Sequence, residues 1–191
     1  RSWGVPIPSV RDTKTGESLL TPEIVSRFAD HVATEGTDCW FTRPVEDFLP
    51  DAMKGEAGRY EKESNILDVW FDSGASHLGV LDAREELTWP ADLYLEGSDQ
   101  HRGWFQSSLW VAMGVKGEAP YRAVLTHGFI LDEKGQPMSK SLGNVIPPQD
   151  VINQMGADVL RLWVASEEYR SDVSVSKDIL NQVSGGYRRI R

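Results

Sequence analysis

The sequence predicts an α/β fold, a parallel sheet followed by an α-helical segment. Two apolar runs, 66–71 and 92–96, each end in a small polar turn, as buried parallel strands do. A helical stretch separates the second run from a third, 120–131, and strand, helix and strand at this spacing form a βαβ unit. Because ligands of such sheets bind beyond the carboxyl ends of the strands, we expect one crevice there. The three strand ends lie near Asp72, Glu96 and His127.

Composition limits the class of protein. The chain has 191 residues, 40% hydrophobic and 26% charged, which suffices for one domain with a substantial core. A net charge of −9 argues against a general nucleic-acid binder. Only residues 161–191 carry an excess of positive charge, six Lys/Arg against four Asp/Glu. Any contact with RNA is therefore expected near the C-terminal end.

A single cysteine, Cys39, excludes an internal disulfide and a multi-cysteine zinc site, and it fits a reducing, cytoplasmic setting. We assign no protein-bound metal, because His31, His77 and His127 lack partners at metal-ligand spacing. No run is apolar enough to span a membrane and no signal peptide is found. The chain begins without methionine and ends within an amphipathic helical pattern, so we expect a piece of a longer protein.

The first third of the chain has the weakest pattern. Residues 3–8 are apolar and broken by prolines, which favours an edge strand. Thr21 and Pro22 have the order of a helix N-cap and first turn, and apolar residues recur at helical spacing up to Val32. Residues 42–60 contain two prolines and two glycines, which favours a loop with one short helix.

The helix of the βαβ unit follows Asp99, and its apolar residues are expected on a buried side. They are Trp104, Phe105, Leu109, Trp110, Ala112 and Met113.

The last part of the chain, from about Val145, is expected to be an all-helical layer. Its pattern predicts helices over 150–155 and 157–168, and the second is apolar nearly all round and hence largely buried. Ser176 is the expected N-cap of a last helix with apolar residues on one face.

Two segments carry residues suited to chemistry. In 126–144, Lys140 lies between Ser139 and Ser141 in a small-residue loop, which would aim a flexible point charge at an anion. In 96–104, a glycine at a strand end lets a ligand approach the backbone, and the acids beside it suit ribose hydroxyls or an ammonium group. Each segment has a plain alternative, a solvated hairpin loop and a capped turn with solvated acids.

These segments resemble a known family. Met138-Ser139-Lys140-Ser141, followed by Leu142-Gly143-Asn144, is similar to the Lys-Met-Ser-Lys-Ser signature of class I aminoacyl-tRNA synthetases. Segments 68–74 and 96–104 resemble the isoleucyl-tRNA synthetase family in particular. The resemblance is strong over 65–175 and the first eight residues, and thin over 9–60.

The resemblance implies the second half of a Rossmann-like nucleotide-binding domain. Residues 1–64 would be an opening strand and the remnant of a connecting insertion. Residues 65–144 would be the half-domain with the lysine loop, and 145–191 a helical segment that contacts the tRNA stem and leads to an anticodon-binding domain. The family's other signature, His-Ile-Gly-His, belongs to the first half of the fold and is absent from this sequence.

Roles in binding the adenylate follow residue by residue from the resemblance. Glu96 would contact the aminoacyl-adenylate, Gly97 and Asp99 would lie at its ribose, and Gln100 near its amino-acid end.

Two tryptophans, Trp70 and Trp104, would wall the pocket for the isoleucine side chain, although plain core packing is the alternative for each. His127 and Gly128 would lie beside the adenine.

The lysine loop would bind ATP through Met138, Ser139, Lys140 and Ser141, with Lys140 as the catalytic residue that meets the phosphates. Pro137 stands where the family's signature has its first lysine, so one of two phosphate contacts is missing.

The implied activity is that of an isoleucine–tRNA ligase, which activates isoleucine with ATP and passes it to tRNA(Ile). Mg²⁺ would be bound through the ATP phosphates, and the intact protein would be a cytoplasmic monomer without a membrane partner. Three alternatives stay open: another nucleotidyltransferase of the same fold, a module that binds ATP or adenylate without chemistry, and an inert fragment whose half-sheet exposes apolar surface.

Overall fold

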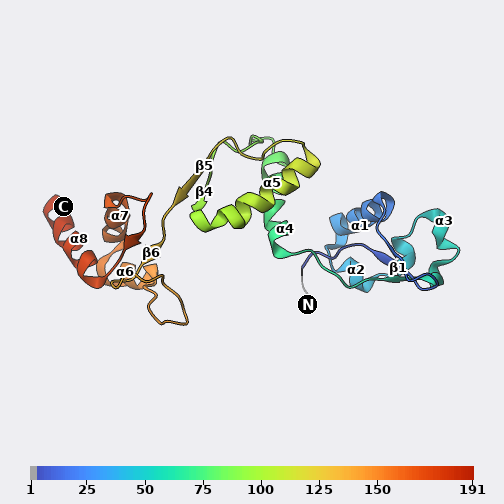
Figure 1. Cartoon of the computed structure of the whole chain (residues 1–191), viewed down its shortest axis with the longest axis horizontal. Helices are drawn as coiled ribbons and strands as arrows, with labels where there is room; N and C mark the ends of the chain where they lie inside the picture. The colour runs from blue at the N-terminus through green and yellow to red at the C-terminus, as the bar shows by residue number, and fades with distance from the viewer. Residues whose placement is uncertain (1–3) are drawn as a thin grey trace. The chain divides into compact units, whose positions relative to one another are not determined.

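A short antiparallel sheet holds the first part of the chain together. The computed structural model describes residues 4–191, which divide into two units at Ser76 and His77 (Figure 1). In the first unit the strand order is β2-β1-β3, and both pairings are antiparallel. The strands are β1 (Val10–Asp12), β2 (Ser18–Leu19) and β3 (Tyr60–Lys62).

The longest helix of the first unit is α1 (Pro22–Glu35), and its predicted start is confirmed. The Thr21 hydroxyl accepts from the Ile24 backbone N at 3.3 Å, which satisfies one of the free N–H groups of the first turn. Short helices follow, namely α2 (Cys39–Thr42), η1 (Val45–Asp47), α3 (Asp51–Lys54) and η2 (Ala57–Arg59).

The core of the first unit lies between α1, the short helices and the sheet. Trp40, Phe48 and Leu49 are fully buried at its centre. Its other members are Val10, Ile24, Phe28, Cys39 and Ala57. The part of the chain with the weakest sequence pattern therefore has a complete core of its own.

The opening strand predicted over 3–8 includes Trp3, which lies outside the described residues; Pro6 forms an isolated antiparallel bridge with Ile66.

The prediction of a buried strand at 66–71 is wrong. Beyond Ile66 the chain enters helix α4 (Val69–Gly74), because the Asp68 carboxylate accepts from the Trp70 backbone N at 2.8 Å and caps the first turn. Val69, Trp70 and Phe71 are about half exposed. Asp72 therefore does not end a strand, and only two of the three predicted strand ends exist.

The second unit contains the predicted βαβ unit. Strands β4 (Tyr94–Gly97) and β5 (Val124–His127) are parallel neighbours, and helix α5 (Trp104–Val115) connects them. The 3-10 helix η4 (Ser98–Arg102) links β4 to α5, and a π-helical turn, η3 (Leu78–Asp82), precedes β4.

Helix α5 buries less than its sequence predicts. Phe105 and Ala112 are buried, but Trp110 and Met113 are 67% and 50% exposed. A helix that is apolar on several sides cannot bury all of them against a two-stranded sheet. The prediction that both residues face a core is wrong for this chain.

The C-terminal helices are α6 (Pro148–Met155), α7 (Ala157–Ser166) and α8 (Lys177–Ile190), as predicted. The Ser176 hydroxyl accepts from the Ile179 backbone N at 3.2 Å, so its cap is confirmed. Val151, Trp163, Val175 and Leu180 form the core of this region. Val164, by contrast, is 60% exposed, so α7 is buried on one side only.

This region is not all-helical. Strand β6 (Ile130–Leu131), which follows β5 after a break at Gly128, pairs in parallel with β7 (Val173–Ser174). The predicted third strand is thus two short strands, β5 and β6. The pairing of β6 with β7 connects the hairpin before the lysine loop to the C-terminal helices. Within residues 4–191 every helix is too short or too polar to cross a membrane.

Candidate functional site

The carboxyl ends of β4 and β5 lie side by side. In the parallel register Glu96 is opposite Thr126, and Gly97 is opposite His127. The structure therefore brings together two of the predicted strand ends, which lie thirty residues apart in the sequence. The free N–H groups and polar side chains that follow such ends are where parallel sheets bind their ligands.

Asp99 folds back over the end of β4. A Cβ atom placed on Gly97 would lie 2.6 Å from Asp99 Oδ1 and 3.7 Å from His127 Cε1. The space beside Gly97 is therefore filled by the carboxylate of Asp99, next to the imidazole of His127. A glycine is required there for the carboxylate to take this position.

Gln100 links this carboxylate to helix α5. Its Nε2 donates to Asp99 Oδ2 at 3.2 Å, and its Oε1 accepts from the Trp104 backbone N at 2.9 Å. The second bond satisfies a free N–H of the first turn of α5. Gln100 therefore sets the direction of the Asp99 carboxylate relative to the start of the helix.

Trp104 stacks on Tyr94. The ring centroids are 4.1 Å apart, with an interplanar angle of 2°. Tyr94 is buried under the helix, and this burial raises the pKa of its phenol. Tyr94 was not among the residues predicted for the site, although the sequence offers one signal for it, an aromatic residue on the same face of β4 as Glu96.

His127 has a fixed tautomer when neutral. Its Nδ1 lies 2.9 Å from the Gly128 carbonyl oxygen, which can only accept, so Nδ1 carries the proton. This leaves Nε2 as a hydrogen-bond acceptor in the neutral ring.

Gly128 is needed for a close approach of two chain segments. A Cβ atom there would lie 2.2 Å from the Ser171 carbonyl oxygen, and the Gly128 N donates to the Tyr169 carbonyl at 2.9 Å. This packing explains a glycine at position 128 without a ligand. Its predicted place beside the adenine stays a prediction.

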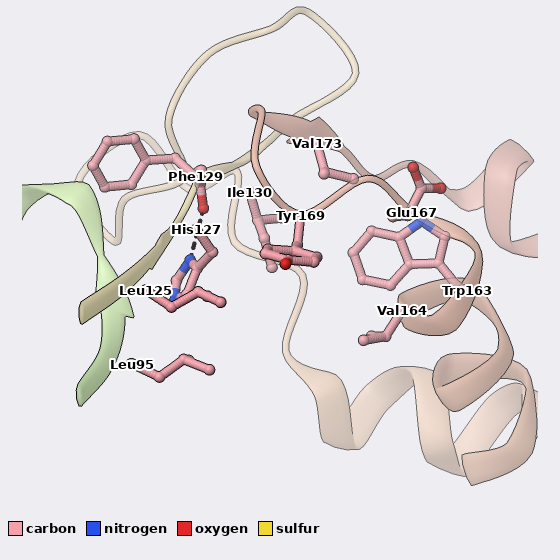
Figure 2. A pocket seen from close by; sticks show the side chains of 11 residues that line it. Leu95, Leu125, His127, Phe129, Ile130, Trp163, Val164, Glu167, Tyr169 and Val173 are labelled. Atoms are coloured by element: carbon pink, nitrogen blue, oxygen red, sulfur yellow. Dashed lines mark hydrogen bonds between the residues drawn. The ribbon is translucent and has the colours of Figure 1, made fainter. Parts of the chain in front are cut away.

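An apolar pocket of 470 Å³ lies against the open face of β4 and β5. Figure 2 shows Leu95 and Leu125 on one side of it and Trp163, Val164 and Tyr169 on the other. The remaining lining residues are His127, Gly128, Phe129, Ile130, Glu167 and Val173. This pocket has no signal in the sequence, because one of its walls comes from α7 and the segment after it, far along the chain from β4 and β5.

The lysine loop, defined as residues 137–144, is held by its own polar groups. Ser139 Oγ lies 3.1 Å from Ser141 Oγ and accepts from the Leu142 backbone N at 3.2 Å. Lys140 is exposed, and its ammonium group makes no hydrogen bond or ion pair with any described residue. A cation without a protein partner on an ordered loop is suited to bind an anionic ligand.

Met138 and Trp70 are the remaining residues predicted for the site. Met138 packs against the hydrophobic core of the C-terminal helices, so its side chain anchors the lysine loop there. Trp70 belongs to the first unit and is 48% exposed. Its place in a pocket for isoleucine stays a prediction, as do the ligand roles of the other residues.

Residues 4–191 contain no group of three or more His, Cys, Asp or Glu side chains that could hold a metal ion.

Comparisons with known proteins fit this geometry. The family described as tRNA synthetases class I (I, L, M and V) matches residues 1–176. An isoleucine–tRNA ligase of Symbiobacterium thermophilum is 56% identical over 196 residues, and one of Syntrophomonas wolfei is 53% identical over 194 residues. Both alignments cover 100% of this chain but 21% of the relative, so the chain spans about a fifth of the length of these proteins.

Solved structures show a similar fold. A ternary complex of Agrobacterium radiobacter LeuRS with tRNA and LeuAMS has a TM-score of 0.70 and 20% identity, covering 99% of this chain and 26% of that one. A Mycobacterium tuberculosis methionyl-tRNA synthetase bound to methionyl-adenylate has a TM-score of 0.52 and 24% identity, covering 70% and 32%.

Proposed function

Because the chain belongs to the class I tRNA synthetase family, as its motifs predict, we propose that it is the adenylate-binding part of an isoleucine–tRNA ligase. The intact protein would activate isoleucine with ATP and transfer it to tRNA(Ile). The observation that carries this proposal is the parallel register of β4 and β5, which sets Gly97 and Asp99 beside His127. Identity of 52–56% to isoleucine–tRNA ligases supports isoleucine as the amino acid.

The end of β4 would hold the adenylate. Asp99, oriented by Gln100, would accept from the ribose hydroxyls, and the bare backbone of Gly97 would let the ribose approach. Glu96 is exposed, and its carboxylate makes no hydrogen bond or ion pair with the described residues, so it is available to the aminoacyl-adenylate.

The amino-acid end would lie near Gln100 and Trp104. Trp104, held flat by Tyr94, would form one wall of the isoleucine pocket. His127 and Gly128 would run beside the adenine, where the fixed tautomer of His127 leaves Nε2 to accept from a ligand N–H.

The first reaction would be attack by a carboxylate oxygen of isoleucine on the α-phosphorus of ATP. A new P–O bond forms, the bond from the α-phosphorus to the bridging oxygen breaks, and its electron pair leaves with pyrophosphate. Charge therefore builds on the leaving group, and the Lys140 ammonium would offset it. Met138, Ser139 and Ser141 would hold the lysine loop against the phosphates.

The second reaction would transfer the isoleucyl group from the adenylate to a ribose hydroxyl of tRNA(Ile), with AMP as the leaving group. Mg²⁺ on the ATP phosphates would supply further charge neutralisation. We assign none of its ligands to this chain. The same proposal makes the intact protein a cytoplasmic monomer.

A binding module without chemistry is the second candidate for the chain by itself. Leu95 of β4 and Ile130 of β6 are about half exposed in the lining of the apolar pocket, so residues 4–191 leave these two strands without a covering layer on this side. The chain would then hold ATP or adenylate but need other parts of the protein for the reaction.

Isoleucine-dependent ATP–pyrophosphate exchange tests both candidates, measured on the isolated chain and on the full-length enzyme that carries it, with valine and leucine as competing substrates. The Lys140→Ala variant should lower exchange about 100-fold in the active form, the scale of losing one charge-stabilising donor. Isoleucine binding should stay the same. Lys134→Ala, at an exposed lysine of the same hairpin, is the matched control and should change exchange less than about twofold.

Equal losses of exchange and of isoleucine binding in Lys140→Ala would contradict the role of the lysine. Exchange by the full-length enzyme alone would identify the isolated chain as the binding module.

A further inference from the structure

Asn144 fastens the lysine loop to the hairpin before it. Its Nδ2 donates to Asp132 Oδ2 at 2.9 Å and to the Pro137 carbonyl oxygen at 3.2 Å, and its Oδ1 accepts from the Ser139 backbone N at 2.9 Å. One side chain thus holds the beginning of the loop and the residue before Lys140. Asn144 is half-buried, whereas Lys140 is exposed.

Asp132 accepts the hydrogen bond from Asn144 with Oδ2, because its Oδ1 already accepts two backbone hydrogen bonds. Its Oδ1 accepts from the backbone N of Lys134 at 2.9 Å and of Gln136 at 2.8 Å, which closes the turn of the hairpin. The Asp132 backbone N donates to the Gln136 carbonyl at 2.9 Å, and Leu131 bridges to Pro137. Asp132 therefore stands on a rigid turn anchored to β6.

We propose that Asp132 and Asn144, the clasp pair, are positioning residues that order the lysine loop and hold Lys140 toward the phosphates of ATP. This inference rests on the proposed function for its ligand. The clasp pair touches no reacting atom; it acts through the backbone at Pro137 and Ser139.

The proline at position 137 makes the orientation of Lys140 by the clasp pair more important in this chain. A proline there supplies no side-chain cation, so Lys140 is the one lysine left in the loop. A single flexible ammonium group contributes most when the backbone that carries it is fixed before the ligand arrives. Pro137 is compatible with this arrangement, because the contact uses its carbonyl oxygen, which accepts from Asn144 Nδ2. The N–H that proline lacks takes no part in it.

Exchanging the side chains of Asp132 and Asn144 tests whether an effect comes from their hydrogen bond or from mutation of the loop in general. Asn144→Asp places two carboxylates together, and Asp132→Asn removes the acceptor that faces the Asn144 amide; each breaks the pair. The double variant Asp132→Asn/Asn144→Asp restores a donor opposite an acceptor between the two side chains, but it leaves the Pro137 carbonyl without its donor. Asn153→Asp in α6, where Asn153 accepts from Gln149 at 2.9 Å, is the matched control for the same chemical change.

The first measurement follows the loop on the chain itself. We expect trypsin to cleave after Lys140 about tenfold faster in each single variant, at a rate between these and the original in the double variant, and at the original rate in Asn153→Asp. Circular dichroism of each variant reports whether the helices are retained. Equal cleavage rates in the original chain and in folded single variants would overturn the clasp.

The second measurement follows the reaction in the full-length enzyme. Each single variant should lower kcat of pyrophosphate exchange about tenfold with the KM for isoleucine unchanged, and the double variant should recover part of this loss. In a Lys140→Ala background Asn144→Asp should cause no further loss, because the clasp acts through the lysine. A full additional loss there would overturn the positioning role.

These outcomes distinguish the two proposals. If Lys140→Ala leaves exchange unchanged, the proposed role of the lysine fails, while the cleavage rates still decide whether the clasp pair orders the loop.

Discussion

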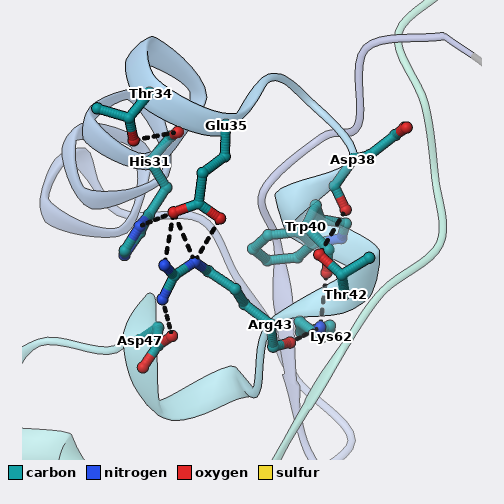
Figure 3. Close-up of polar contacts among 9 residues, drawn as sticks. All are labelled: His31, Thr34, Glu35, Asp38, Trp40, Thr42, Arg43, Asp47 and Lys62. Atoms are coloured by element: carbon teal, nitrogen blue, oxygen red, sulfur yellow. Dashed lines mark hydrogen bonds and ion pairs between the residues drawn. The ribbon is translucent and has the colours of Figure 1, made fainter.

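In the first unit Arg43 binds two carboxylates, whereas Lys140 of the second unit has no partner among residues 4–191. Figure 3 shows Arg43 between Glu35 and Asp47. Its Nε lies 3.0 and 2.8 Å from the two oxygens of Glu35, and its Nη1 lies 2.7 Å from Asp47 Oδ2. The pKa of this guanidinium is raised above its ordinary value, first by Glu35 and then by Asp47.

Lys62 of the first unit also has its charge bound by groups of the same unit. Its ammonium donates to the Trp40 carbonyl at 2.6 Å and to the Arg43 carbonyl, at the C-terminal end of α2, and it lies 5.7 Å from the Phe48 ring centroid. Burial lowers its pKa. A lysine enclosed by carbonyl groups and rings is unavailable to a ligand.

These cations differ in their surroundings, and the use of Lys140 to bind a ligand stays a proposal. In the first unit the acceptors of Arg43 and Lys62 come from the same unit, so their charges stabilise the fold. In the lysine loop the polar groups bond to one another and leave the ammonium of Lys140 free. The surroundings of a cation, more than its residue type, indicate its use.

The largest effect is expected at the core of the first unit. Trp40 is fully buried, and its Nε1 donates to the Glu63 carbonyl at 2.8 Å. Trp40→Ala should therefore lower the unfolding free energy of the first unit by about 3–5 kcal/mol. Hydrogen exchange of amides in β1 and β3, compared with those of α6–α8, measures this unit by unit.

Phe41→Ala is the matched control, because Phe41 lies in the same short helix and is 46% exposed. Its effect should stay below about 1 kcal/mol. If the Trp40→Ala variant loses protection from hydrogen exchange equally in both units, the two cores are not independent.

A smaller effect is expected from Gly128→Ala. The added Cβ would meet the backbone of Ser171 and Asp172 at 2.2–2.5 Å, and backbone cannot move aside as a side chain does. Stability of the second unit should fall by about 1–3 kcal/mol as the segment after α7 separates from β6. Gly114→Ala in α5, where nothing lies within 4 Å, should instead stabilise by about 0.5–1 kcal/mol, and urea midpoints of both variants measure the difference.

Acid should destabilise the first unit through Asp12. Its carboxylate is buried against Arg59, whose Nε lies 2.9 Å from both oxygens, and this bond is the main reason that the pKa of Asp12 is far below its ordinary value. A lowered pKa means that the folded state favours the charged form, so the stabilisation is complete above about pH 4 and is lost as pH falls below it.

Urea midpoints between pH 7 and pH 2 measure this loss. Asp12→Asn should be less stable at pH 7 and show a shallower decline on acidification. The same pH dependence in the variant would assign the decline to other carboxylates.

Local signals in the sequence predicted the fold where one short stretch decides it. Thr21 and Ser176 cap helices with their own hydroxyls, and the apolar run before Glu96 became β4 as expected. The run at 66–71 was misjudged because a short apolar run fits a strand or a helix equally well, and the carboxylate of Asp68 decides for the helix.

The sequence also predicted the two segments of the candidate site, 96–104 and the lysine loop. It did not predict the residues that hold these segments in place. Lys140 was found because a motif surrounds it, whereas Asp132 and Asn144 lie twelve positions apart and carry no periodic signal. Tyr94 beneath Trp104 depends likewise on a helix returning over its strand. Such contacts depend on tertiary packing, which neither propensity nor spacing encodes.

The smallest change in stability, with a clear change in function, is expected from Gly97→Ala. The backbone of Gly97, at φ −65° and ψ 158°, suits alanine, and the atom in the way is Asp99 Oδ1, the free end of a side chain. The unfolding free energy should therefore change by less than about 0.5 kcal/mol. The displaced carboxylate loses its bond from Gln100 and its proposed place at the ribose, so pyrophosphate exchange should fall roughly tenfold.

Asp99→Ala and the double variant Gly97→Ala/Asp99→Ala separate this explanation from a direct clash with the ligand. If Gly97 acts by making room for Asp99, the double variant is no slower than Asp99→Ala alone. If the two losses multiply, the new methyl group obstructs the ligand itself, and the close approach of the ribose to the backbone of Gly97 becomes the better explanation. In either case a folded chain with a damaged reaction would place Gly97 with the residues of the site, in contrast to Gly128, whose glycine serves the packing of the chain.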